Sequence, residues 1–169
     1  MKNISFRNDV LPLKNKLFRL SLRITLNKEE AEDIVQDTLI KIWDKRFEWD
    51  SIDSIENFSF KICRNLSLDR IKRKDNKNKS LNELSEGLNS SYTPQDAIIL
   101  RDKLNVVRDI INSLPEKQRT CLQLRDFEGK KYREIAKVLD ITEEQVKINI
   151  FRARNTIKVK YQDIEQYGL

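Results

Sequence analysis

The sequence predicts an all-α protein made of two small helical domains joined by a flexible linker, with a helix-turn-helix in the second domain. The chain of 169 residues contains only three glycines and three prolines. Apolar residues recur at helical spacing, and strand-like alternation is scarce. The spacing lapses once, which divides the chain into residues 1–75, 76–95 and 96–169. Each domain then has about 75 residues, a size at which small domains fold alone.

Three helices are expected in the first domain. The first covers residues 13–24, where four aliphatic side chains share one stripe. The second starts near Asn27, because acidic residues follow where a helix dipole is positive, and it continues to about Lys45. Its inner stripe is Ala31, Ile34, Val35, Thr38 and Ile42. The third starts near Asp53, and we expect its Phe58 to fill a core position.

The segment between the two domains supports no sustained periodicity. It is rich in Asn and Ser and contains Gly87 and Pro94, so we interpret it as a linker. Helical spacing resumes at Ile98 and is interrupted after Leu114 by a proline. It then continues toward the C-terminus.

The stretch YREIAKVLDITEEQVKINIFRAR, residues 132–154, has the parts of a helix-turn-helix. Ala136 is small enough for close helix approach, and Asp140 stands at the tight turn, where it tolerates a positive φ better than most residues. Thr142 and Gln145 form the capping box that begins the second helix. A generic helical hairpin remains the alternative interpretation of this motif alone.

The second helix of this motif has apolar residues on two opposite faces. At about 100° per residue, one stripe is formed by Val146, Ile150, Ala153 and Ile157. Ile148 and Phe151 fall on the other side. Because one helix cannot bury both faces in a small domain, either it is sandwiched between two layers or its outer face meets another molecule.

A DNA major groove is one such partner for the outer face. Apolar atoms suit the thymine methyl group, and Lys or Arg suits guanine. The residues placed to meet base edges are Lys147, Ile148, Phe151 and Arg152. Those that flank them and are placed to hold phosphates are Arg125, Tyr132, Arg154 and Lys158.

Charge is distributed unevenly along the chain, whose formal net charge is +6. Lys28 to Glu56 has four basic and ten acidic residues, Lys61 to Lys79 has eight and two, and Lys130 to Lys160 has nine and four. A solvated surface usually intersperses the two signs, whereas charge blocks often mark interaction surfaces. The basic blocks favour a polyanionic partner.

The residue inventory disfavours an enzyme of familiar type. The chain has no histidine, no phosphate-binding GKS or GKT loop and no GxSxG or HExxH motif, so we expect no cofactor, metal site or small-molecule substrate. Cys63 and Cys121 each lie in an apolar helical pattern, which predicts buried free thiols. Neither a signal peptide nor a run of about 18 apolar residues is present, so a cytoplasmic location is expected.

Two motifs resemble the extracytoplasmic-function sigma factors, small specificity subunits of bacterial RNA polymerase in the sigma-70 family. AEDIVQDTLIKIWDK and NFSFKICRNLSLDRIKRK are similar to the second conserved region of that family. LPEKQRTCLQLRDFEGKKYREIAKVLDITEEQVKINIFRAR is similar to its fourth. The order of the motifs and the linker between them match the family, and together they span most of the chain.

The resemblance implies a role for each predicted surface. In the family, the acidic helix binds the polymerase clamp, and the matching residues here are Asp33, Gln36, Asp37 and Ile40. The following helix recognises the minus-ten promoter element, partly as a single strand, and the matching residues are Lys61, Arg64, Asn65 and Asp69. The helix-turn-helix then reads the minus-thirty-five element as duplex. Core RNA polymerase, through its β′ clamp and β flap, and promoter DNA are the expected partners.

Further expectations and alternatives accompany the resemblance. Family members are often held inactive by an anti-sigma protein, frequently membrane-anchored, so such a partner is expected. Ile148 and Asn149 stand where many members have Ser and Arg, so the upstream sequence preference does not transfer. Two interpretations compete with this one: an autonomous helix-turn-helix regulator, and an adaptor that docks through its basic faces.

Overall fold

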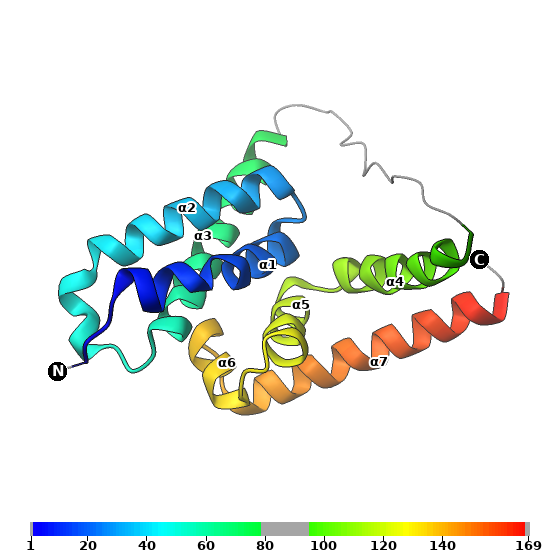
Figure 1. Cartoon of the computed structure of the whole chain (residues 1–169). Helices are drawn as coiled ribbons and strands as arrows, with labels where there is room; N and C mark the ends of the chain where they lie inside the picture. Colours follow the sequence, from blue (N-terminus) through cyan, green and yellow to red (C-terminus); the bar gives the residue numbers. More distant parts are fainter. Residues whose placement is uncertain (1, 79–94, 168–169) are drawn as a thin grey trace.

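The computed structural model describes residues 2–78 and 95–167, and every regular element within these ranges is helical, as predicted (Figure 1). The N-terminal unit, residues 2–78, contains η1 (Phe6–Val10), η2 (Leu11–Leu13), α1 (Lys14–Thr25), α2 (Lys28–Asp44), η3 (Arg46–Ser51) and α3 (Ile55–Asn78). The C-terminal unit, residues 95–167, contains α4 (Gln95–Ser113), α5 (Glu116–Leu122), η4 (Gln123–Phe127), α6 (Tyr132–Leu139) and α7 (Glu143–Tyr167). Of the linker predicted over residues 76–95, residues 79–94 lie outside the described residues.

The N-terminal unit is a bundle in which α1, α2 and α3 pack against one another. As predicted, α2 begins after Asn27, whose side chain accepts a hydrogen bond from the backbone N–H of Glu30 at 3.0 Å. Leu26, with a φ of 58°, makes the left-handed turn that ends α1. All five residues of the inner stripe predicted for α2 are buried, so this helix faces the core as expected.

The buried side of α3 differs from the prediction. Phe58 is only half-buried, whereas Phe60 and Cys63 are fully buried. The reason is that α3 packs against α1 and α2 and also against α6 of the C-terminal unit. Burial on more than one side moves the deepest positions away from the stripe that a single neighbour would select.

The C-terminal unit is organised around the long helix α7. The N-terminal half of α7 packs on α5 and α6, and its C-terminal half runs beside α4 (Figure 1). Asp140 ends α6 with a φ of 55°, the left-handed conformation expected at this turn. The side chains of Thr142 and Gln145 each accept a hydrogen bond from the other residue's backbone N–H, at 3.1 and 2.9 Å, which confirms the predicted capping box.

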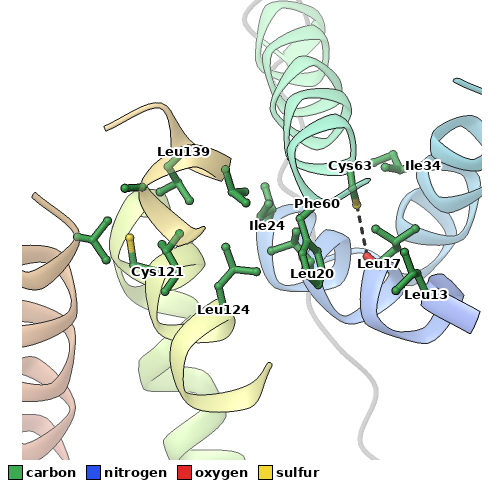
Figure 2. Packing of buried hydrophobic residues seen from close by; sticks show 14 of the residues in the cluster. Leu13, Leu17, Leu20, Ile24, Ile34, Phe60, Cys63, Cys121, Leu124 and Leu139 are labelled. Atoms are coloured by element: carbon green, nitrogen blue, oxygen red, sulfur yellow. Dashed lines mark hydrogen bonds between the residues drawn. The ribbon is translucent and has the colours of Figure 1, made fainter. Parts of the chain in front are cut away.

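The two units share one large hydrophobic cluster, and each also has a smaller buried cluster of its own. Leu20, Ile24 and Phe60 of the N-terminal unit face Leu124 and Leu139 of the C-terminal unit (Figure 2). Burial of apolar surface is the main source of folding stability, so the contact between the units contributes to it directly. The sequence pattern, which resolves two domains, did not indicate this contact.

Both cysteines are buried free thiols, as predicted. Burial raises the pKa of the Cys63 thiol to about 12, and the same cause raises that of Cys121 to about 12. The Cys63 thiol donates a hydrogen bond to the Leu17 carbonyl at 3.4 Å. Because the thiolate is the reactive form, both side chains are inert in the folded protein.

Candidate nucleic-acid interface

The outer face of α7 is uncovered by the rest of the described chain. Three residues of the predicted stripe, Val146, Ile150 and Ala153, are buried beneath the helix, and the fourth, Ile157, is partly buried. Ile148 is 47% exposed and Phe151 is 72% exposed on the opposite side. The sandwich alternative is therefore excluded within the described residues. The exposed apolar side chains of this face are available to bind another molecule.

Cationic side chains accompany these apolar residues. Lys147 and Arg152 are exposed on α7 beside Ile148 and Phe151. The Lys147 ammonium lies 6.0 Å from the centre of the Tyr132 ring, so α6 and α7 contribute to one surface. The structure thus brings together the four residues predicted to meet base edges.

Three of the four flanking residues predicted to hold phosphates, Arg125, Tyr132 and Arg154, are positioned by protein contacts, and Lys158 is exposed. The Arg125 guanidinium lies 4.6 Å from the Tyr132 ring centre and donates to the Lys130 carbonyl at 2.9 Å. Arg154 donates to both carboxylate oxygens of Asp126, at 2.6 and 3.3 Å, and this hydrogen bonding raises its pKa. Both guanidinium groups are therefore held in place, which suits backbone contacts at the edge of a reading helix.

The basic helix α3 presents only part of its predicted site. Lys61, Asn65 and Asp69 are exposed, but Arg64 is buried. Two nitrogens of Arg64, Nε and Nη2, donate to the two carboxylate oxygens of Glu116 in the C-terminal unit, each at 3.0 Å. The four residues predicted on this helix thus do not form one open surface.

The predicted outer face of α2 is exposed. Asp33, Gln36 and Asp37 are all accessible, and Ile40 is 59% exposed. Arg70 of α3 approaches this acidic face, with its Nη2 3.7 Å from an oxygen of Asp37. The face keeps its acidic and apolar character, since the single cation balances only part of the charge.

An aromatic extension of this face was missed by the sequence interpretation. Trp43 is 46% exposed and Phe47 is 84% exposed, while the Arg46 guanidinium lies 4.7 and 4.5 Å from their respective ring centres. The position of Trp43, three residues after Ile40 on α2, was the available signal, because such residues share a helix face. In contrast, Trp49 is buried and its Nε1 donates to the Ile42 carbonyl at 3.1 Å.

A hollow on the C-terminal unit was also missed. It has a volume of about 310 Å³, and Ile111, Leu122, Phe127 and Ile157 line its apolar part. Its residues come from α4, α5, η4 and α7, so no local sequence motif indicates it.

Within residues 2–78 and 95–167, no helix is long and apolar enough to cross a membrane. The same residues contain no group of three or more His, Cys, Asp or Glu side chains placed to hold a metal.

Two family models match the chain in the order of its two units. Residues 10–77 match the model for sigma-70 region 2, and residues 104–157 match the model for sigma-70 region 4. The first match covers the bundle of α1, α2 and α3. The second covers the helix-turn-helix and the helices that support it.

Curated proteins are similar to nearly the whole chain. The ECF RNA polymerase sigma factor SigW of Bacillus subtilis (strain 168) is 29% identical over 163 residues, which cover 89% of this chain and 86% of that protein. The RNA polymerase sigma-H factor of Pseudomonas aeruginosa is 28% identical over 165 residues, covering 92% and 85%. The resemblance therefore spans both units.

Solved structures share the fold. The sigma factor RpoE, in a complex with the anti-sigma factor NepR from Bartonella quintana, has a TM-score of 0.75 at 22% identity and is covered to 96% by 93% of this chain. CnrH, in a complex with the cytosolic domain of CnrY, has a TM-score of 0.63 at 21% identity. The match covers 91% of this chain and 85% of CnrH.

Proposed function

The chain belongs to the extracytoplasmic-function sigma factors of the sigma-70 family, and we propose that its three surfaces divide the work of promoter recognition. In this proposal, α7 reads the minus-thirty-five element, α3 recognises the minus-ten element, and α2 docks on core RNA polymerase. The observation that carries it is the uncovered outer face of α7, in a helix-turn-helix whose inner residues Val146, Ile150 and Ala153 are buried.

For the upstream element, α7 would lie in the major groove. Ile148 and Phe151 supply apolar atoms suited to thymine methyl groups, and Lys147 and Arg152 supply donors suited to guanine. Arg125 and Arg154, held by Tyr132 and by Asp126, flank the reading face and would bind phosphates.

For the downstream element, α3 would contribute Lys61, Arg64, Asn65 and Asp69. Capture of an unpaired strand needs a cationic track beside polar groups, and α3 provides both. Lys61 and Asn65 are accessible in this structure, while Arg64 is held by Glu116. Use of the whole set therefore requires Arg64 to be released.

The polymerase face of α2 combines acidic residues with exposed apolar ones. Asp33, Gln36, Asp37 and Ile40 are accessible together, and Trp43 extends the apolar part. Exposed apolar groups of this kind, surrounded by charge, are typical of protein-binding surfaces. Catalysis would remain with the polymerase, and this chain would carry out no bond chemistry itself. Work with RNA polymerase also supports a cytoplasmic location.

An anti-sigma protein is a further proposed partner. RpoE, which shares this fold, was solved with the anti-sigma factor NepR. The exposed apolar residues of α2, together with the hollow between α4 and α7, offer surfaces to such a protein. Tight binding would then compete with core RNA polymerase for the same chain.

Run-off transcription with core RNA polymerase tests the overall proposal. Adding this protein should produce initiation at a defined site that core polymerase alone does not use. An autonomous regulator would instead bind a specific duplex without polymerase and give no initiation. That second result would contradict the proposal.

Charge reversal tests the polymerase face. Asp37→Lys should weaken association with core RNA polymerase, because it places a cation in an acidic face. The matched control is Asp163→Lys, which reverses an exposed charge near the end of α7. Circular dichroism should show both variants folded. Equal polymerase affinity for the two variants would refute the assignment of α2.

A further inference from the structure

Ion pairs connect the N-terminal and C-terminal units around their shared apolar cluster. Arg64 binds Glu116, Arg19 donates to both carboxylate oxygens of Glu128 at 2.8 and 3.0 Å, and Glu56 pairs with Lys130. Burial opposes ionisation of Glu56, yet hydrogen bonds from Lys130 and Lys16 outweigh it and lower the pKa of this carboxyl group. Opposite charges are therefore paired across the interface.

A buried arginine also joins the units. Arg119 of α5 donates to the carbonyl oxygens of Leu114 and Asn112 at 3.0 and 3.1 Å, and to that of Ile24 in α1 at 3.1 Å. The carbonyl groups at the C-terminal end of a helix carry partial negative charge. Arg119 thus binds the ends of α1 and α4 with a single guanidinium group, in the interior of the contact.

The Arg64–Glu116 pair has a particular geometry. A carboxylate that accepts two parallel hydrogen bonds from one guanidinium occupies the same donors that a phosphate would use. The Arg64 side chain is only 8% exposed. While the pair is intact, a DNA backbone cannot reach these donors. Arg154 makes a similar pair with Asp126, but its side chain is 51% exposed and stays accessible to a phosphate. Glu116 is itself fixed by the hydroxyl group of Thr120, which donates to it at 2.8 Å.

We propose that this structure is a closed conformer in which Glu116 takes the place of a promoter phosphate on Arg64, so that the minus-ten face of α3 is completed only when the two units separate. The outer face of α7 stays accessible in the closed conformer, because Ile148 and Phe151 are exposed. The closure itself follows from the contacts between the units. Its consequence for DNA rests on the role proposed above for α3.

Energy transfer between two dyes on the full chain measures the closure. Asp50→Cys and Arg133→Cys place exposed thiols on η3 and α6, near the Asp53–Lys137 ion pair that joins the units at 3.7 Å. Cys63 and Cys121 are buried, so they stay unlabelled in the folded protein. The labelled protein should show high transfer, because the two sites lie on adjoining parts of the closed conformer.

Glu116→Gln tests the pair. It leaves Arg64 buried without its counter-charge, which should raise the ratio of open to closed molecules at least about tenfold and lower the transfer. The matched control is Glu30→Gln, which breaks the Lys74–Glu30 pair of 3.0 Å inside the N-terminal unit and should leave the transfer unchanged. If Glu116→Gln and the control give the same transfer as the parent protein, the closure by this pair is overturned.

A charge exchange keeps the test decisive if Glu116→Gln unfolds. Arg64→Glu combined with Glu116→Arg rebuilds the pair with its charges exchanged, so it should fold and return the transfer toward the parent value. Failure of the exchange to restore high transfer in a folded protein would also contradict the proposal.

Transcription separates the closure from its proposed consequence. With core RNA polymerase, Glu116→Gln should reach half-maximal run-off product at a lower protein concentration than the parent, because Arg64 is already free. If the transfer falls but this concentration stays the same, the pair closes the protein without restricting the minus-ten face, and the role given to Arg64 is overturned. Loss of all initiation by the parent protein would instead reject the proposed function.

Discussion

The two helices assigned to DNA differ in how the fold presents them. α7 buries Val146, Ile150 and Ala153 on its inner side, and its outer face, with Ile148 and Phe151, is open to solvent. α3 is packed on more than one side, and Arg64, its central cation, is bound by a carboxylate of the other unit. The outer face of α7 is therefore accessible in this structure, whereas the proposed role of α3 requires a change of conformation that releases Arg64.

The difference follows from what each helix buries. An exposed Phe or Ile costs little folding free energy, since much of any protein surface is apolar. The outer face of α7 can therefore stay uncovered when no partner is bound. A buried guanidinium costs several kcal/mol unless it is paired, so α3 cannot bury Arg64 without Glu116. Arg64 thus depends on Glu116 while DNA is absent, whereas Arg119 in the same interface is satisfied by carbonyl oxygens.

Removal of a buried aromatic ring from α3 should have the largest effect on stability. Phe60→Ala takes a fully buried side chain from the cluster between the units and should lower the free energy of unfolding by about 3–5 kcal/mol. Urea denaturation followed by circular dichroism measures the loss. The phenylalanine of the other face is the control, because Phe151 is 72% exposed and its replacement by Ala should change stability by only about 0.5 kcal/mol or less.

The same pair of variants shows whether the units unfold together. If the cluster couples them, Phe60→Ala shifts one transition that includes both units. A shift confined to part of the transition, with the rest unchanged, would show that the two units are independent and that their contact adds little stability.

The next effect concerns α7 alone. Arg152→Ala should reduce affinity for the preferred upstream duplex by about 1–3 kcal/mol and relax sequence preference at one or two positions, if it makes a bidentate base contact. Arg154→Ala should weaken binding on all sequences and reduce its salt dependence. The affinity of the polymerase complex for several duplex sequences, measured at several salt concentrations, distinguishes the effects of the two variants. Equal losses on every sequence for both variants would mean that base and phosphate contacts are wrongly sorted.

Local features of the fold were predictable because their causes are local. The start of α2 at Asn27, the left-handed turn at Asp140 and the Thr142 capping box depend on residues within a few positions of one another. The two faces of α7 follow from helical periodicity for the same reason. The two-unit organisation also follows from the sequence, since the periodicity lapses between them.

The contact between the units was not predictable in this way. Arg64 and Glu116 are 52 positions apart, and nothing in either local pattern pairs them. Burial from two sides also explains why Phe60 rather than Phe58 lies deepest in α3. The sequence therefore indicates which residues are basic enough to bind DNA, while only the tertiary contacts show which of them are already occupied.

The smallest effect compares the caps of one helix from each unit. Thr142→Ala removes the acceptor for the backbone N–H of Gln145 at the start of α7, and Asn27→Ala removes the acceptor for that of Glu30 in α2. Each should cost about 1 kcal/mol of unfolding free energy. Thr156→Ala, in the interior of α7, is the control and should be neutral or slightly stabilising, because Ala has the higher helix propensity. If the units unfold as one, both cap variants lower the same urea midpoint, and if Thr142→Ala matches its control, the capping box does not stabilise the reading helix.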